Sequence, residues 1–153
     1  MSAALRETVL AYLRDHTVLT LATSGPAGLW AAAVFYANEG FNLYFLSAPT
    51  SRHSLNIAAT GTVAGTIQEN YRDWTAIKGI QLAGPVTRLA RAAQAEAIRL
   101  YGEKYPLVGQ ADHAPPAIAK ALHQVAWYKI EPSELYFVDN AQGFGHRDQV
   151  RLP

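Results

Sequence analysis

The sequence contains no cysteine and few charged residues. The absence of thiols excludes disulfide bonds, thiolate nucleophiles and thiolate metal sites. Only 16% of the 153 residues are charged and the formal net charge is +1, so we expect no nucleic-acid surface and no long disordered tail. The longest apolar stretch, residues 30–37, is far shorter than the roughly 20 residues that cross a bilayer. We therefore expect a protein that binds neither nucleic acid nor membrane.

The N-terminal segment does not read as a signal peptide, because Arg6, Glu7 and Arg14 place charges through its middle. This pattern is compatible with a cytoplasmic protein, which is the location that we expect. The length fits one domain over residues 1–153, with an N-terminal helix over 1–16 and a C-terminal tail over 140–153.

Half of the residues are hydrophobic, and their spacing predicts about six or seven strands with helices at the front, middle and late positions. The predicted strands cover residues 17–23, 29–36, 43–47, 63–69, 76–89, 125–130 and 134–139. The predicted helices cover residues 3–16, 51–59, 91–105 and 116–123. A hairpin turn is expected at 37–40, bulges or bends at Gly79 and Gly84–Pro85, and a loop over 106–116. Tight turns between consecutive strands favour a small antiparallel barrel with peripheral helices over a doubly wound sheet.

The junction between the strand at 43–47 and the helix that follows it is a candidate phosphate site. Thr50 is the expected N-cap, so the free amides of the first helical turn and the helix dipole would face outward. Arg52 adds a positive charge, and Thr50, Ser51, Ser54 and His53 add side-chain donors. These groups suit a phosphate monoester. On these residues alone, an equally good interpretation is that Thr50 and Ser51 only cap a helix and Arg52 points into water.

Small side chains occupy the middle of the strand predicted at 29–36. Ala31, Ala32 and Ala33 leave room either for something flat against the sheet or for tight packing on a helix, and packing is the safer interpretation.

The tail mixes glycine with aromatic and basic residues between Gly143 and Arg147. Gly145 would let the backbone approach a ligand or a partner chain closely. An ordered, functional tail is favoured, because Phe144 would be costly to leave in water. The alternative is a frayed, solvated terminus.

No protein-built catalytic or metal centre emerges from the sequence. The five histidines lack ligand-like spacing with Asp or Glu, so no metal site is expected. Ser51 and His53 are too close in sequence to form a catalytic triad, and Glu69 and Asp73 are interpreted as surface charges. Because no residue is an obvious proton-transfer group, the catalytic residues stay unassigned, and a bound cofactor would have to carry any chemistry.

The order of these elements resembles the FMN-binding split-barrel flavoproteins, the family of pyridoxamine 5′-phosphate oxidase and its relatives, over about residues 15–139. The letters that carry the resemblance are LYFLS at 43–47 and SRH at 51–53. His53 stands where the family has a lysine, which makes the charge at this position depend on pH. The stretch KGIQLAG at 78–84 resembles the next cofactor-contacting strand, and residues 127–139 resemble the closing hairpin. With GFGHR at 143–147, the pattern looks closest to a small, uncharacterised subfamily.

The resemblance implies an antiparallel split β-barrel of about six strands with peripheral helices, mainly β in class (α+β). It also implies a homodimer that binds FMN at the subunit interface. The phosphate would lie on Ser51, Arg52 and His53, with Ser47 nearby. The flavin ring would lie on the backbone of Ala31, Ala32, Ala33 and Val34. Lys78 and Gln81 would come from the second chain, and the tail around Phe144 and Arg147 would close over the ring.

The sequence also departs from the oxidases. Counting back from Ser51, the family's arginine and lysine positions hold Ala31 and Tyr36, and the tail's arginine–histidine grip on the substrate is not reproduced. The resemblance therefore implies a flavin-dependent oxidoreductase that acts on a small organic substrate or a nicotinamide donor, but not on pyridoxamine phosphate. The alternatives are a non-catalytic flavin- or haem-binding protein of the same fold and, more weakly, a plain interaction domain.

Overall fold

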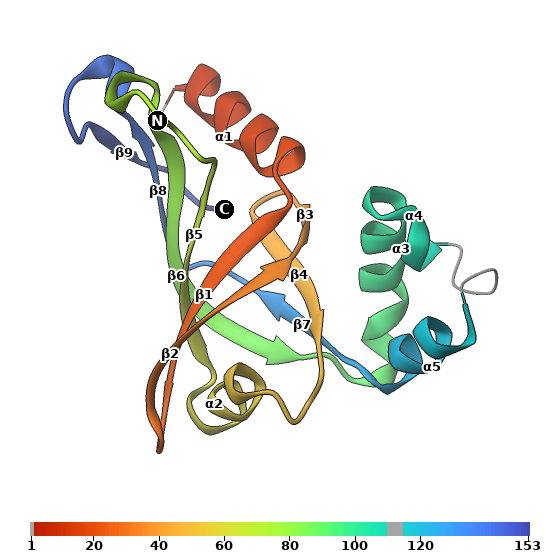
Figure 1. Cartoon of the computed structure of the whole chain (residues 1–153). Helices are drawn as coiled ribbons and strands as arrows, with labels where there is room; N and C mark the ends of the chain where they lie inside the picture. The colour runs from red at the N-terminus through yellow and green to blue at the C-terminus, as the bar shows by residue number, and fades with distance from the viewer. Residues whose placement is uncertain (1, 110–114) are drawn as a thin grey trace.

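Antiparallel strands form one curled sheet in the computed structural model, which describes residues 2–109 and 115–153 (Figure 1). The main path through the sheet is β2-β1-β5-β6-β7-β4-β3, and β8 pairs with β6 and β9. Nine strands lie in the described ranges: β1 (Val18–Gly25), β2 (Gly28–Phe35), β3 (Ala37–Glu39), β4 (Asn42–Ser47), β5 (Thr62–Gln68), β6 (Lys78–Arg88), β7 (Ala126–Ile130), β8 (Glu134–Asp139) and β9 (Arg147–Gln149). The mainly β, antiparallel fold expected from the sequence is confirmed.

The sheet divides at the middle of its longest strand, β6. The first half of β6 pairs with β8, from Lys78 to Ala83, and the second half pairs with β7, from Val86 to Arg88. The closing hairpin predicted for residues 127–139 is therefore wrong, because β7 and β8 lie along the same edge of β6 and do not pair with each other. Figure 1 shows β6 curving at this point.

Gly84 lies where the sheet divides, and the turn between β7 and β8 crosses directly over it. A Cβ atom on Gly84 would lie 2.6 Å from the Ser133 nitrogen and 2.7 Å from the Glu131 carbonyl oxygen, so only glycine fits. The register between β5 and β6 runs without interruption from Thr62–Pro85 to Gln68–Gly79, so the bulges considered for β6 do not occur against β5.

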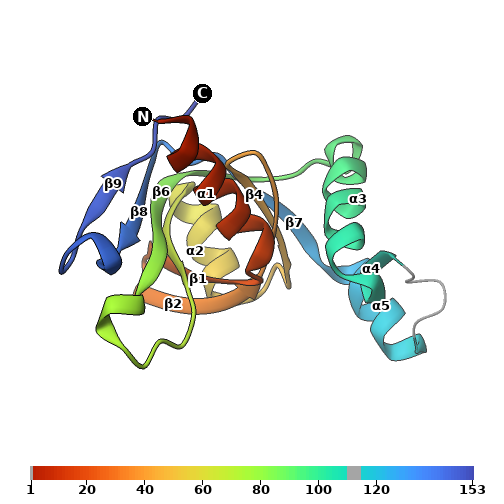
Figure 2. The same cartoon turned by 90° about the horizontal axis from the view of Figure 1, so that it is seen from above.

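The helices lie outside the sheet at three places (Figures 1 and 2). They are α1 (Ala3–Asp15), α2 (Arg52–Thr60), α3 (Gln94–Lys104), α4 (Pro106–Gly109) and α5 (Pro116–Gln124). The helices α3, α4 and α5 form an arm at one side of the sheet. None of the helices in the described ranges has the length and apolar character needed to span a bilayer.

Two helix predictions are corrected. The helix expected at 91–105 begins as a 3-10 turn, η2 (Arg91–Ala93), and becomes α-helical only at Gln94. Part of the loop predicted at 106–116 is helical, since α4 occupies Pro106–Gly109, where proline fits the first turn of a helix. Residues 110–114 of that loop lie outside the described residues.

The core lies inside the curl of the sheet, and α1 covers it with Val9, Tyr12 and Leu13. The strand β5 shows the pattern most clearly, because its residues alternate strictly between exposed and buried. Leu19, Leu21, Phe45, Ile67 and Ile80 are among the most deeply buried core residues.

The opposite face of the sheet carries small side chains, and no helix of the described residues covers it over β1, β2, β5 and β6 (Figures 1 and 2). Ala31, Ala22, Ala64 and Ala83 pair in register across β2, β1, β5 and β6. At the edge of the same face, Phe35 is 56% exposed. We call this surface the open face. The packing of Ala31 and Ala33 on a helix, favoured from the sequence, does not occur within the chain, since both are exposed.

The two strands that the sequence did not predict are the short ones, β3 and β9. Residues 37–39 were predicted as part of a turn, but they pair with β4, and the turn falls at Gly40 and Phe41. Gly40 has a φ of 57°, the left-handed conformation that such a turn needs. The strand β9 lies in the tail and adds to the edge of β8.

Candidate functional site

The predicted phosphate site lies where β4 ends and α2 begins. The N-cap of α2 is Ser51, not Thr50: the Ser51 side chain accepts a hydrogen bond from the Ser54 amide, and Thr50 is an exposed turn residue. The Ser51 amide donates to the Ala48 carbonyl over 3.0 Å and closes the turn. Helix geometry leaves the amides of Arg52 and His53 without an intrahelical acceptor, so the start of α2 offers backbone donors and partial positive charge.

Three polar side chains converge at this helix start. The His53 Nε2 atom lies 2.5 Å from the Ser47 hydroxyl oxygen and 3.3 Å from that of Ser51, and the two hydroxyl oxygens are 3.3 Å apart. The Ser51 hydroxyl also donates to the Ser54 hydroxyl over 2.8 Å. The structure thus brings together three of the predicted phosphate ligands. Burial lowers the pKa of the His53 imidazole below its ordinary value.

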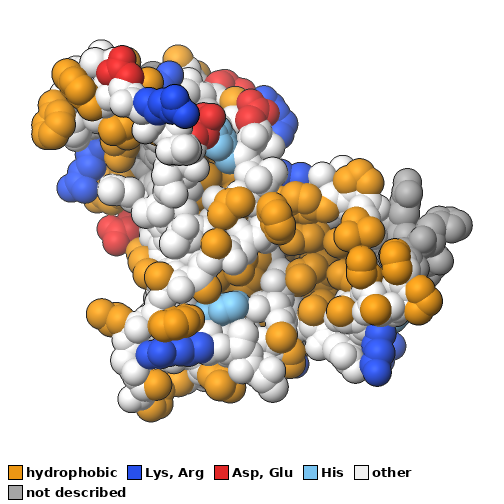
Figure 3. Space-filling view, in the orientation of Figure 1, with side chains coloured by type: hydrophobic (Ala, Val, Ile, Leu, Met, Phe, Trp, Pro, Cys, Tyr) orange, Lys and Arg blue, Asp and Glu red, His pale blue; other side chains and the backbone are white. Residues whose placement is uncertain are grey.

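The side chain of Arg52, the fourth predicted ligand, extends from the start of α2 to the hairpin between β1 and β2. Its guanidinium donates to the Ala27 carbonyl over 3.0 Å and stacks on the Trp30 ring, with its central carbon 4.2 Å from the ring centroid. This cation–π contact holds the positive charge at the same end of the sheet as α2. On this face of the molecule, basic side chains lie beside hydrophobic ones in the lower part, and a His side chain reaches the surface near them (Figure 3). Trp30 was not singled out from the sequence, because its contact with Arg52 is not local.

A buried polar pair fixes α2 against the sheet. The Asn56 side-chain amide donates to the Thr23 hydroxyl over 3.1 Å, and each residue is 3% exposed. A Cβ atom on Gly25 would lie 2.1 Å from the Asn56 side-chain oxygen, so glycine allows this approach. Sequence reasoning missed Asn56 as a supporting residue. A polar residue on the apolar side of a predicted helix was the available signal.

Four other predicted residues form a second group: Lys78 and Gln81 in the first half of β6, Phe144 in the segment after β8, and Arg147 at the start of β9. The Arg147 guanidinium reaches the Gln81 side-chain oxygen over 3.5 Å and lies over the Tyr136 ring, 5.0 Å from its centroid. A cavity of about 380 Å³ borders Gln81, Tyr136 and Arg147 on the open face. Lys78 is exposed at the start of β6, and its carbonyl accepts a hydrogen bond of 3.1 Å from the Tyr12 hydroxyl.

Phe144 belongs to this second group but is not buried. It is 86% exposed and lies edge-on to the Trp74 ring, at a centroid distance of 5.8 Å. The tail is structured all the same, because Asn140 is buried and binds the Trp74 carbonyl and the Gly145 amide. The sequence favoured an ordered tail because Phe144 would be costly to leave in water. The tail is ordered, but Phe144 stays exposed in the single chain, so the reason for the prediction is wrong. Gly145 has a φ of 70° and open space around it, so a turn, not close approach, requires glycine there.

The two groups lie at opposite ends of the sheet within one chain. Figure 1 shows α2 at the lower end of the sheet and β8 and β9 near its upper end. Between them, Ala31, Ala32, Ala33 and Val34 run along β2, the edge strand of the open face, with Ala31 and Ala33 exposed and the other two half-buried. A second cavity, of about 310 Å³, lies on this face and shares Ala64 and Ala83 with the first.

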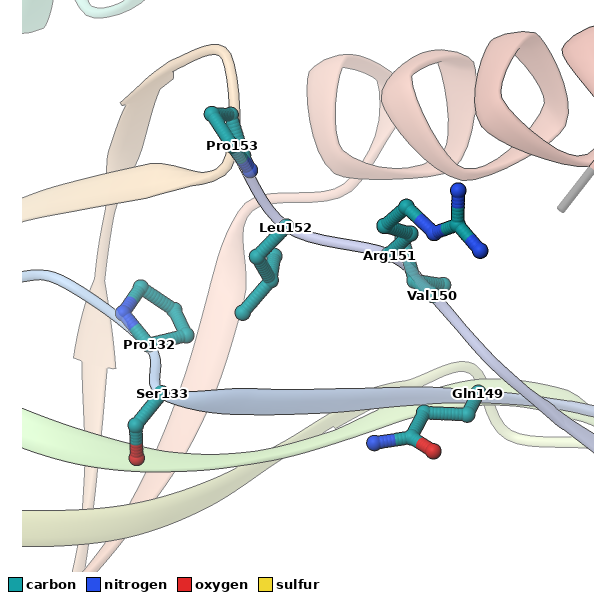
Figure 4. A pocket seen from close by; sticks show the side chains of 7 residues that line it. All are labelled: Pro132, Ser133, Gln149, Val150, Arg151, Leu152 and Pro153. Carbon is teal, nitrogen blue, oxygen red and sulfur yellow. The ribbon is translucent and has the colours of Figure 1, made fainter.

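A larger cavity, of about 550 Å³, shares no lining residue with these two cavities, and its wall consists of the β7–β8 turn and the C-terminal segment (Figure 4). It contains none of the predicted ligands. In residues 2–109 and 115–153, His, Asp and Glu side chains nowhere gather in a group of three that could hold a metal ion.

The position at which the resemblance to the oxidases implies a lysine is a core residue here. Tyr36 is fully buried, and its hydroxyl donates to the Leu13 carbonyl over 2.7 Å. Burial raises the pKa of this phenol well above its ordinary value. Tyr36 therefore cannot take the place of a substrate-binding lysine.

Comparison with known proteins gives the same fold and assigns the family. Residues 5–139 match the family model of pyridoxamine 5′-phosphate oxidase. The chain therefore belongs to the pyridoxamine 5′-phosphate oxidase family. It belongs there with the UPF0306 proteins, since it is 30% identical to one from Enterobacter sp. (strain 638) over 138 residues, which cover 89% of each chain.

Two solved structures show the same fold at low sequence identity. A FAD-binding protein of Mesorhizobium loti is 17% identical with a TM-score of 0.66, over 90% of this chain and 94% of the other. HutZ, the haem storage protein of Vibrio cholerae, is 16% identical with a TM-score of 0.69, over 86% of this chain and 92% of the other. The split-barrel fold is thus confirmed.

Proposed function

We propose that this protein binds FMN between two copies of the chain and acts as a flavin-dependent oxidoreductase on a small organic substrate. The observation that carries the proposal is the convergence of Ser47, Ser51 and His53 at the positively polarised start of α2. Hydroxyls, an imidazole and free helix amides form a donor set suited to a phosphate monoester. Membership of the pyridoxamine 5′-phosphate oxidase family supports a flavin as the molecule that carries this phosphate. A bound flavin would supply the redox chemistry.

The chain's own residues would hold and orient the flavin. Ser47, Ser51 and His53 would bind its phosphate, and Arg52 on the Trp30 ring would supply positive charge beside it. The small side chains of Ala31 and Ala33 leave the β2 backbone accessible to a flat ring. Lys78 and Gln81 of the second copy would face the pyrimidine edge of that ring. The partner's Phe144 and Arg147 would cover it.

Two observations support a homodimer. The open face is an uncovered sheet of alanine and threonine side chains with Phe35 exposed at its edge, and such a face can pack closely on a second sheet. The two groups of predicted ligands lie at opposite ends of one chain, and a twofold axis through the open face would bring the ends of two chains together. Each of the two sites would then contain residues of both subunits.

Pyridoxamine phosphate is not the proposed substrate. Ala31 offers no charge at the position that holds arginine in the oxidases, and Tyr36 is sealed in the core. The cationic side chains that would grip a second phosphate are therefore missing from β2.

The visible spectrum of the purified protein tests the proposal. Absorbance near about 450 nm that bleaches anaerobically with a nicotinamide donor is expected for an active flavoprotein. Arg52→Glu should abolish flavin retention, whereas Arg14→Glu makes the same charge change on exposed α1 and should retain it. A folded Arg52→Glu protein that keeps its full yellow colour would contradict the phosphate assignment.

A second candidate is a non-catalytic flavin- or haem-binding protein. HutZ has the same fold, and His146 in the tail is a partly exposed imidazole whose Nε2 lies 3.1 Å from an Asp148 carboxylate oxygen. A sharp band near about 400 nm after addition of haemin, shifted in His146→Ala, would favour haem. Flavin absorbance without bleaching by any donor would favour binding alone.

A further inference from the structure

The imidazole of His53 occupies the centre of the proposed phosphate site. Its Nε2 atom is within 3.3 Å of two hydroxyl oxygens, one on β4 and one at the N-cap of α2. These are the hydrogen-bond partners of the ring. The neighbouring cation, Arg52, points instead to Ala27 and Trp30, and none of the ion pairs in the described part of the chain involves His53.

This environment disfavours the charged form of the imidazole until an anion arrives. The ring is half-buried, and this burial lowers the pKa of the imidazole below its ordinary value; the hydrogen-bond partners of Nε2 are neutral hydroxyls, and in the described ranges no carboxylate forms an ion pair with it. A phosphate monoester placed among Ser47, Ser51 and the helix amides would bring about two negative charges near Nε2. An opposite charge at that distance favours the imidazolium, and phosphate and proton would then bind cooperatively.

We propose that His53 couples the binding of the FMN phosphate to the uptake of one proton, so that the protein retains FMN more tightly near pH 6.5 than near pH 8.5. This inference rests on the proposed function and adds to it a pH control of cofactor loading. The proton comes from solvent and goes to the imidazole as the phosphate binds, and it leaves when the phosphate leaves. A lysine in this place would keep its charge throughout the same range, since its ordinary pKa is about 10.4.

The pH window follows from the chemistry of the ligand. The second pKa of a phosphate monoester is about 6, so between pH 6.5 and 8.5 the phosphate is mostly a dianion and its own titration contributes little. If the bound phosphate raises the pKa of His53 by between one and two units, FMN affinity should fall by about tenfold across this window.

The test measures dissociation constants of FMN and riboflavin at pH 6.5, 7.5 and 8.5 by quenching of flavin fluorescence. Riboflavin has the same ring without the phosphate, and so it reports any pH effect on the ring site or on dimerisation. The wild-type protein should bind FMN about tenfold more weakly at pH 8.5 than at 6.5 and riboflavin with little change. His53→Lys should bind FMN with an almost flat profile, and His53→Gln should bind it weakly at every pH.

Calorimetry in buffers of different ionisation enthalpy gives an independent measurement. Near pH 7.5, wild-type protein should take up a fraction of a proton for each FMN bound, and His53→Lys should take up almost none. Parallel FMN profiles for the wild type and His53→Lys, or an equal pH effect on riboflavin, would overturn the inference and leave FMN binding intact. Absence of FMN binding at every pH in both proteins would instead overturn the proposed function, and the inference with it.

Discussion

Replacing either member of the buried Asn56–Thr23 pair, which holds α2 against the sheet, should lower the unfolding free energy. Asn56 donates to Thr23 over 3.1 Å, and both side chains are almost completely buried. Asn56→Leu keeps the shape of the side chain but leaves the Thr23 hydroxyl without its partner. A buried polar group left unsatisfied costs about 1–3 kcal/mol, so we expect a loss of about 2 kcal/mol in unfolding free energy. For a chain of this size, that corresponds to a fall of about 4–8 °C in melting temperature.

The assay is urea unfolding of a double-mutant cycle. Thr23→Val alone should also be destabilising, because it leaves the Asn56 amide unpaired in the core. The double variant, Asn56→Leu with Thr23→Val, removes both polar groups and should be more stable than the sum of the single effects predicts, by about 1 kcal/mol or more. Asn38→Ala is the control, since the Asn38 side chain donates to the Gly40 carbonyl at the exposed β3–β4 turn and its loss should change stability by about 0.5 kcal/mol or less. Additive single effects would refute the direct contact.

Three further predictions concern the divided sheet, the helical arm and the open face. Gly84→Ala should lower the unfolding free energy by about 1–3 kcal/mol, because its Cβ would meet the backbone of the β7–β8 turn; an unchanged urea midpoint would contradict that packing. Burial lowers the pKa of Lys104 to about 8, so between about pH 8 and 9, below the pH at which tyrosines ionise in the unfolded chain, the unfolded chain holds a proton that the folded chain has released; stability should rise with pH there, and Lys104→Met should remove that rise. A slope that survives the substitution would rule out Lys104 as its source. Phe35→Glu on the open face should convert a dimer to a monomer in sedimentation experiments, whereas Leu107→Glu, at a similarly exposed site on the arm, should not; dimers in both variants would place the interface elsewhere.

Local signals in the sequence were sufficient for most of the elements. Seven strands, the helix α1 and the strand–turn–helix at the predicted phosphate site follow from periodicity, a proline and capping residues, all of which act within a few positions. Even there the cap was misplaced by one residue. Thr50 and Ser51 are both good N-caps, and the turn closed by the Ser51 amide on Ala48 decides between them.

Pairing between distant strands decided the rest. Local sequence patterns indicate that β7 and β8 are strands joined by a short turn. They do not indicate that β6, beneath that turn, pairs with β8 along its first half and with β7 along its second half. The short strands β3 and β9 gain their hydrogen bonds only from β4 and β8, so their own residues give little sign of them.

The sequence by itself determined which residues are candidate phosphate ligands, because Ser51, Arg52 and His53 lie together at one helix start. Only the tertiary structure decided where each points: His53 to the hydroxyls of Ser47 and Ser51, and Arg52 to Trp30. It also decided that Tyr36 is sealed in the core and that Phe144 is exposed. The physical reason is that donor chemistry belongs to the individual side chain, whereas burial and direction depend on which distant strands the fold brings beside it.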